Sequence, residues 1–123
     1  MIWVQLGASF MAAGILLGAF GAHGLKVHLT PEMMEIYKTG VLYHLIHSLG
    51  LILVGLLSQQ VSDERYRLCG ILLTAGILLF SGTLYALSLS GIRWLGAITP
   101  LGGLCFLGSW IAVAVVGYRL AYP

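Results

Sequence analysis

Residues 40–50 read Gly-Val-Leu-Tyr-His-Leu-Ile-His-Ser-Leu-Gly and lie in a window, residues 39–62, that holds no Lys, Arg, Asp or Glu. On an α-helix, His44, His47 and Ser48 fall on one narrow face, and the remaining surface is aliphatic. An unpaired polar group in hydrocarbon costs several kcal/mol, so this face needs partners on other helices. The stretch therefore predicts a membrane-spanning helix around which the others are arranged.

Windows without formal charge divide the whole chain; they are residues 1–25, 39–62, 68–92 and 94–118. Each is long enough to cross a bilayer, which takes about 20 apolar residues. Only 8% of the residues are charged and 59% are hydrophobic, whereas a soluble domain is about one quarter charged. The pattern predicts an all-α integral membrane protein: an up-down antiparallel four-helix bundle with both termini on the same side.

The limits of the predicted spans follow from charges and helix-start signals. Thr30 before Pro31 is typical of a helix N-terminus, so the second helix is predicted to start near residue 31, and the third near residue 63. Thr99 before Pro100 repeats the cap-then-proline pattern and predicts the start of the fourth. We expect one membrane domain, residues 1–123, with spans at about 2–22, 39–58, 68–90 and 99–119.

Small residues mark faces where helices can approach each other closely. Four glycines fall within one arc of the first span, and two more lie on the small-residue face of the fourth. Such seams are how membrane helices gain packing energy. The predicted helix-packing positions are Gly7, Gly14, Gly18, Gly21, Gly102 and Gly103. The pattern leaves open whether the partner helix belongs to the same chain.

An up-down bundle concentrates the polar side chains of this sequence in one leaflet. The predicted intramembrane cluster, structural or ligand-binding, is His23, His44, His47, Ser48, Ser81, Tyr85 and Thr99. The interpretation we favour is that the histidines bond to hydroxyls or backbone carbonyls and fix helix pairing. The alternatives are a metal site on His44 and His47 with His23 as a third ligand, a haem or quinone site, and a polar cavity for a small molecule or lipid.

Enzymatic chemistry has little support in this sequence. No carboxylate lies within the spans to orient a base beside Ser48, Ser81 or Thr99, so we predict no catalytic residue, no enzyme and no cofactor. The net charge of +2 is dispersed and forms no basic patch, which argues against nucleic acid as a partner. Three Lys or Arg residues on each side of the membrane leave its orientation open.

Motifs in all four spans resemble one known family. They are GAFGAHGL at 18–25, YHLIHSL at 43–49, FSGTLY at 80–85, and GAITPLGG at 96–103 followed by GSW at 108–110. The chain is similar to the family called domain of unknown function 423, small bacterial inner-membrane proteins such as YgdD and YwdK, with transmembrane protein 256 as an animal relative. The resemblance implies a four-span protein of the cell inner membrane and supplies no activity.

The function we expect is that of a non-enzymatic accessory or assembly partner of a larger membrane complex. The glycine seams and the lack of a catalytic set favour it. Beyond the lipid bilayer, the expected partners are a second copy of the chain or a larger membrane complex. One alternative is an oligomeric transporter or carrier of a small molecule or lipid. Another is a metal- or cofactor-binding membrane protein that uses His44 and His47.

Overall fold

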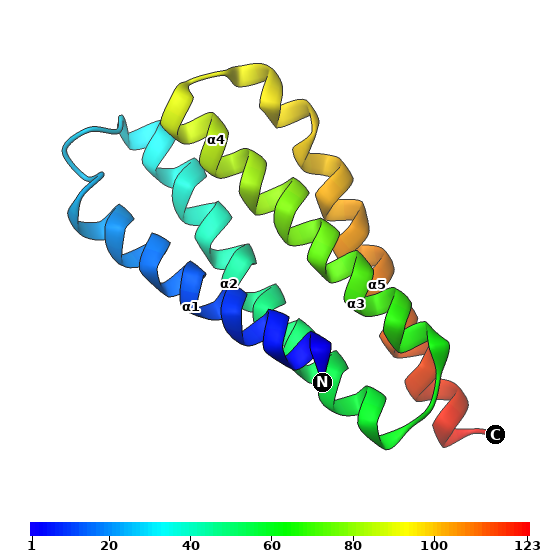
Figure 1. Ribbon diagram of the computed structural model, residues 1–123. Coiled ribbons are helices and arrows are strands. Elements are labelled where there is room, and N and C mark those ends of the chain that lie inside the picture. Colours follow the sequence, from blue (N-terminus) through cyan, green and yellow to red (C-terminus); the bar gives the residue numbers. More distant parts are fainter.

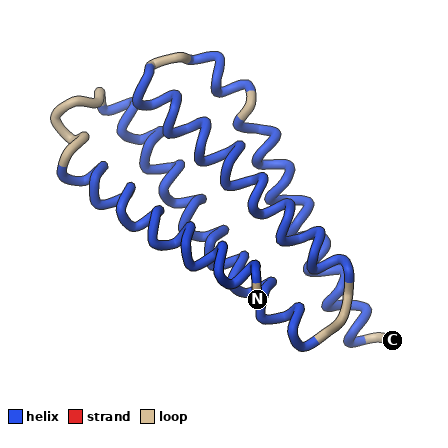
Figure 2. Tube along the Cα trace, in the orientation of Figure 1, coloured by secondary structure: helices blue, strands red, loops and turns tan.

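The computed structural model describes all 123 residues, and its loops are confined to the ends of four helical rods (Figures 1 and 2). The elements in chain order are α1 (Ile2–His23), α2 (Pro31–Gln60), α3 (Glu64–Gly76), the π-helical turn η1 (Ile77–Ser81), α4 (Gly82–Ser90), the 3-10 helix η2 (Arg93–Ala97) and α5 (Thr99–Ala121). Each rod is long and apolar enough to cross a membrane. The predicted all-α, four-helix membrane fold is confirmed.

The rods run alternately up and down. Both termini and the α2–α3 link lie at one end of the bundle, and the other two links lie at the opposite end (Figure 1). The main partner of α1 is α2, and the main partner of α5 is the rod formed by α3, η1 and α4. Since α2 also packs along that rod, these two elements form the centre of the molecule.

Local signals explain two of the helix starts. The Thr30 hydroxyl accepts a hydrogen bond from the backbone N–H of Met33 at 3.2 Å, immediately before Pro31. The Asp63 carboxylate accepts one from the Arg65 N–H at 2.9 Å and caps α3. Both bonds satisfy donors that a helix end leaves free.

The prediction that Thr99 caps the fourth helix is wrong. Ile98 holds the cap position with helical backbone angles, and no side chain closes the first turn of α5. Because the chain enters α5 directly from η2, Thr99 is already helical and its hydroxyl is not aimed at the helix start. It lies instead 2.7 Å from the Thr83 hydroxyl on α4.

The third rod is not the regular helix that the sequence suggested for residues 68–90. Within η1, the Gly82 N–H bonds to the Ile77 carbonyl, five residues back. Such π turns are rare and often lie at functional sites. The core packs beside this turn and toward the termini; its buried residues are Leu51, Val54, Tyr66, Cys69, Leu73, Ile77, Phe106 and Val116.

The glycine seam of α1 packs against α2 of the same chain. A Cβ atom on Gly7 would lie 2.8 Å from the Ser48 carbonyl oxygen, and one on Gly21 would overlap the Tyr37 ring. Gly14 is equally close to α2, while Gly18 is looser. The small side of α1 is therefore used within the chain.

A second close approach joins α5 to η1. Gly102 lies so near the backbone of Phe80 that any side chain there would collide with it. Gly103 has more room, since its Cβ atom would lie 3.8 Å from the Phe80 ring. Of the two predicted packing positions on α5, Gly102 makes the tight contact.

Candidate functional site

His44 is buried on α2 between α1 and α4. Its Nδ1 atom lies 2.8 Å from the hydroxyl of Tyr85 on α4. The hydroxyl makes no other hydrogen bond, so this contact is its one tie to a neighbouring rod. Nε2 is buried without a hydrogen-bond partner, and the ring meets the Phe10 ring of α1 edge-on, with centroids 5.9 Å apart. One imidazole thus links three rods.

His47 points in a different direction. Its Nδ1 lies 2.7 Å from the Tyr43 carbonyl, one turn back in α2, and its ring stacks on Phe106 of α5 with centroids 3.4 Å apart. A carbonyl oxygen can only accept a hydrogen bond, so Nδ1 carries the proton and Nε2 carries the lone pair. The two histidines therefore face different helices.

The serine and threonine hydroxyls of the predicted cluster bond to backbone carbonyls or to another hydroxyl. The Ser81 hydroxyl, fully buried in η1, donates to the Gly40 carbonyl of α2 at 2.7 Å. The Ser48 hydroxyl donates to the His44 carbonyl within α2, also at 2.7 Å. Thr99 meets Thr83, as described above. The structure thus places these residues in separate contacts along the rods and not around one centre.

His23 lies apart from all of them. It is exposed in the last turn of α1, where the chain leaves toward the α1–α2 link. It therefore cannot join His44 and His47 as a third ligand. In the whole chain no three His, Cys, Asp or Glu side chains gather closely enough to hold a metal ion.

Two contacts between helices were missed from the sequence. The hydroxyl of Tyr37 donates to the Leu17 carbonyl of α1. Tyr37 precedes His44 by seven residues, so helical periodicity could have placed it on the same face. The other contact is reciprocal: the Ser109 hydroxyl donates to the Cys69 carbonyl at 3.1 Å, and the Cys69 thiol to the Ser109 carbonyl at 3.6 Å.

Ion pairs lie at the two ends of the bundle. Arg93 of η2 reaches Glu32 in the first turn of α2 at 3.1 Å, and its hydrogen bond and charge lower the pKa of that carboxyl. At the other end Arg65 lies 2.6 Å from Asp63, and hydrogen bonds from its side chain and backbone lower the Asp63 pKa. Formal charge is thus kept out of the spans.

Together these contacts describe a site that holds helices together. The hydroxyls and Nδ1 atoms inside the bundle are engaged with carbonyls or with one another, and no carboxylate lies among them. Chemically the arrangement can fix rotation and register between rods. It offers no nucleophile paired with a free base.

Comparison with known proteins shows which family this chain belongs to. The model of a family described as protein of unknown function, DUF423, matches residues 17–103. The chain belongs to this family. It is 44% identical over 119 residues to the UPF0382 membrane protein YwdK of Bacillus subtilis, covering 96% of this chain and 97% of the relative. The resemblance drawn from the four motifs is confirmed.

Two staphylococcal relatives agree with this assignment. The UPF0382 membrane protein SH2409 of Staphylococcus haemolyticus is 40% identical over 118 residues, which cover 96% of both chains. SERP0230 of Staphylococcus epidermidis is 39% identical over 120 residues, which cover 98% of both. No solved structure matches the chain significantly. The protein is thus a small membrane protein of an uncharacterised family.

Proposed function

We propose that this protein is a non-enzymatic accessory or assembly partner of a larger complex in the cell inner membrane. The observation that carries the proposal is the use of the buried polar groups. Ser81 ties the third rod to Gly40 of α2, and Tyr85 ties it to His44. Polar side chains that serve as ties between helices are not free to serve as catalytic groups.

The outer surface supports the same function. The hollows in the molecule are open and lie along its outside or at its ends, so no passage runs through the bundle. Long apolar side chains cover the outward faces of α1 and α5, among them Leu16 at 71% exposed and Leu104 at 64%. In a bilayer such faces meet lipid tails or the apolar helices of another protein.

The test is the composition of the complex in its native membrane. The chain, tagged and expressed at its natural level, would be extracted directly into copolymer nanodiscs and separately into a mild detergent. We expect native mass spectrometry to give the same additional protein subunits, at fixed stoichiometry, in both media. Particles that hold only this chain and lipid in both media would overturn the proposal.

A flux measurement separates this function from a carrier. The purified chain in liposomes should pass neither protons nor small organic ions faster than protein-free liposomes do. The His47→Ala variant serves as the matched comparison, because His47 bonds through Nδ1 and its Nε2 atom is left free to take up a proton. A flux that the natural chain supports and this variant loses would favour a carrier and contradict the proposal.

A further inference from the structure

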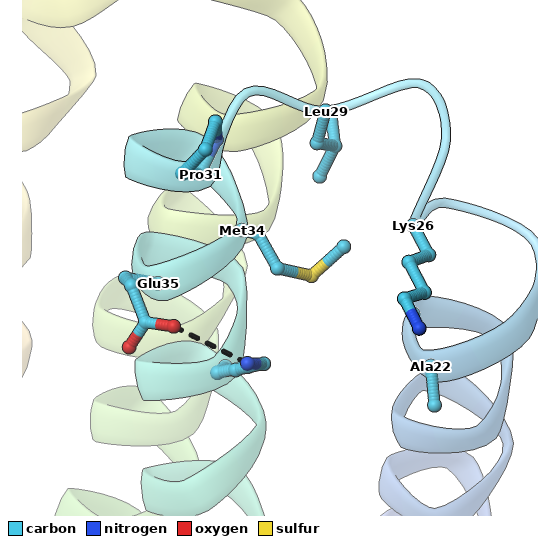
Figure 3. A pocket seen from close by; sticks show the side chains of 8 residues that line it. Ala22, Lys26, Leu29, Pro31, Met34 and Glu35 are labelled. Atoms are coloured by element: carbon cyan, nitrogen blue, oxygen red, sulfur yellow. Dashed lines mark hydrogen bonds and ion pairs between the residues drawn. The ribbon is translucent and has the colours of Figure 1, made fainter.

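A hollow of about 480 Å³ opens between the end of α1 and the start of α2, beneath the link that joins them (Figure 3). Lys26 reaches into it from the link, and Met34 and Lys38 line it from α2. Ala22 forms its wall on α1, so both rods contribute. The hollow lies where the charge-free part of each rod ends, which is the depth of lipid head groups.

A second hollow, of about 250 Å³, continues from the first along the α1–α2 seam. The two share Gly21, Ala22, Met34 and Lys38, and the lining beyond them is apolar except for the Tyr37 hydroxyl. Gly18 on one side and Val41 and Leu45 on the other form that lower part. The first hollow, here called the basin, is charged, and it leads into the second, here called the trough, which is apolar and runs toward the middle of the membrane.

The basin carries an excess of positive charge. Lys26 makes no ion pair, while the Lys38 ammonium lies 3.2 Å from the Glu35 carboxylate. Pro31 also borders the basin, which places the positive end of the α2 dipole at its edge. Two ammonium groups against one carboxylate leave about one net positive charge for a ligand.

The opposite end of the bundle has a hollow of a different kind. It measures about 360 Å³ and is lined by Asp63, Glu64, Arg67 and Met1, so two carboxylates face the Arg67 guanidinium and the N-terminal ammonium and no net positive charge remains. No apolar trough continues from it into the membrane, since the two remaining hollows lie at the α1–α2 link. Only the Lys26 end combines net positive charge with an apolar extension.

We propose that the basin and trough between α1 and α2 bind an anionic phospholipid. Lys26 and Lys38 contact the phosphate, and one acyl chain lies along Gly18 and Leu45. A soluble anion would leave the trough empty, and a zwitterionic lipid would bring a second positive charge beside the lysines. The inference goes beyond the accessory role and holds whether or not a protein partner exists.

The charge part is tested by native mass spectrometry of the detergent-purified chain with added phosphatidylglycerol or phosphatidylcholine. We expect phosphatidylglycerol to bind more tightly. Lys26→Ala should weaken its binding about fivefold, since one lysine near a lipid surface contributes about 1 kcal/mol. Glu35→Gln should strengthen it by freeing Lys38. The matched control is Arg119→Ala, which removes an exposed cation at the far end.

The trough is tested with two tryptophan variants of α1. Ala22→Trp fills the junction of the two hollows, whereas Ala19→Trp adds the same ring on an exposed face outside them. Only the first should lose phosphatidylglycerol binding, with both variants equally stable in the detergent. Equal binding of the two lipids would overturn the inference. So would Lys26→Ala behaving like Arg119→Ala, or Ala22→Trp like Ala19→Trp.

Discussion

Helix α2 is held on two sides by two different kinds of contact. Toward α1 it meets glycines, so that backbones lie close and a single side-chain hydrogen bond, from Tyr37, crosses the seam. Toward the third rod it meets polar side chains, with Ser81 and Tyr85 reaching across. The first contact depends on glycines, which have no side chain, and the second depends on side chains that form hydrogen bonds. They should therefore fail in different ways when a residue is replaced.

The largest effect is expected at the glycine seam. In Gly7→Leu the new side chain would start 2.8 Å from the backbone oxygen of Ser48, which cannot move without displacing α2. Overpacking of this kind costs about 1–3 kcal/mol and occasionally more, and we expect the upper end, about 3 kcal/mol. The change in the free energy of unfolding is measured in bicelles, with steric trapping used to monitor unfolding.

Gly117→Leu is the matched control for that prediction. A Cβ atom on Gly117 would have no neighbour within 4 Å, so the same replacement should leave the unfolding free energy nearly unchanged. Equal losses for the two variants would show that leucine is harmful at any glycine of this protein. The idea of a close seam between α1 and α2 would then be lost.

A smaller effect is expected at the polar contact. A double-mutant cycle with His44→Leu and Tyr85→Phe isolates the bond between the two side chains. Hydrogen bonds between membrane helices average about 0.6 kcal/mol and reach about 1.7 kcal/mol, and the coupling energy should fall in that range. A coupling of zero would mean that the two groups are merely neighbours and that apolar packing holds the third rod.

The smallest effect concerns the ion pair that ties the start of α2 to η2. Arg93 lowers the pKa of Glu32, so the pair stabilises the fold above the ordinary carboxyl pKa, and this stability is lost as the pH falls through the lowered value. Thermal unfolding between pH 7 and pH 3 should show a slight loss that Glu32→Gln lacks. Because both groups are exposed, added salt should weaken the pair. The same pH profile for both chains would contradict this account.

Much of the fold could be predicted from the sequence because membrane insertion obeys one coarse rule. The windows free of charge had to become helices, since only a helix satisfies its own backbone in lipid. The cap at Thr30 followed from its place before Pro31. These features depend on residues near one another in the chain, and no tertiary contact is needed to explain them.

The site was harder to predict because it depends on rotation about each helix axis. His44 and His47 share a face in projection, but 60° of rotation sends one ring toward α4 and the other onto Phe106 of α5. Nothing local distinguishes Gly76 and Gly82, which bracket the π turn, from glycines within a regular helix. Contacts formed between rods decided both outcomes.

The π turn determines how the part of the third rod that follows it is rotated about the helix axis. A turn closed by a five-residue step holds one residue more than its α-helical counterpart. Each residue after it therefore takes the place on the helix that the residue before it in the sequence would have in a regular α-helix. If residues 77–81 formed regular α-helix with no residue removed, the rod beyond them would turn by about 100°, and Tyr85 would point away from His44. The one extra residue held in the π turn thus determines the direction in which Tyr85 points.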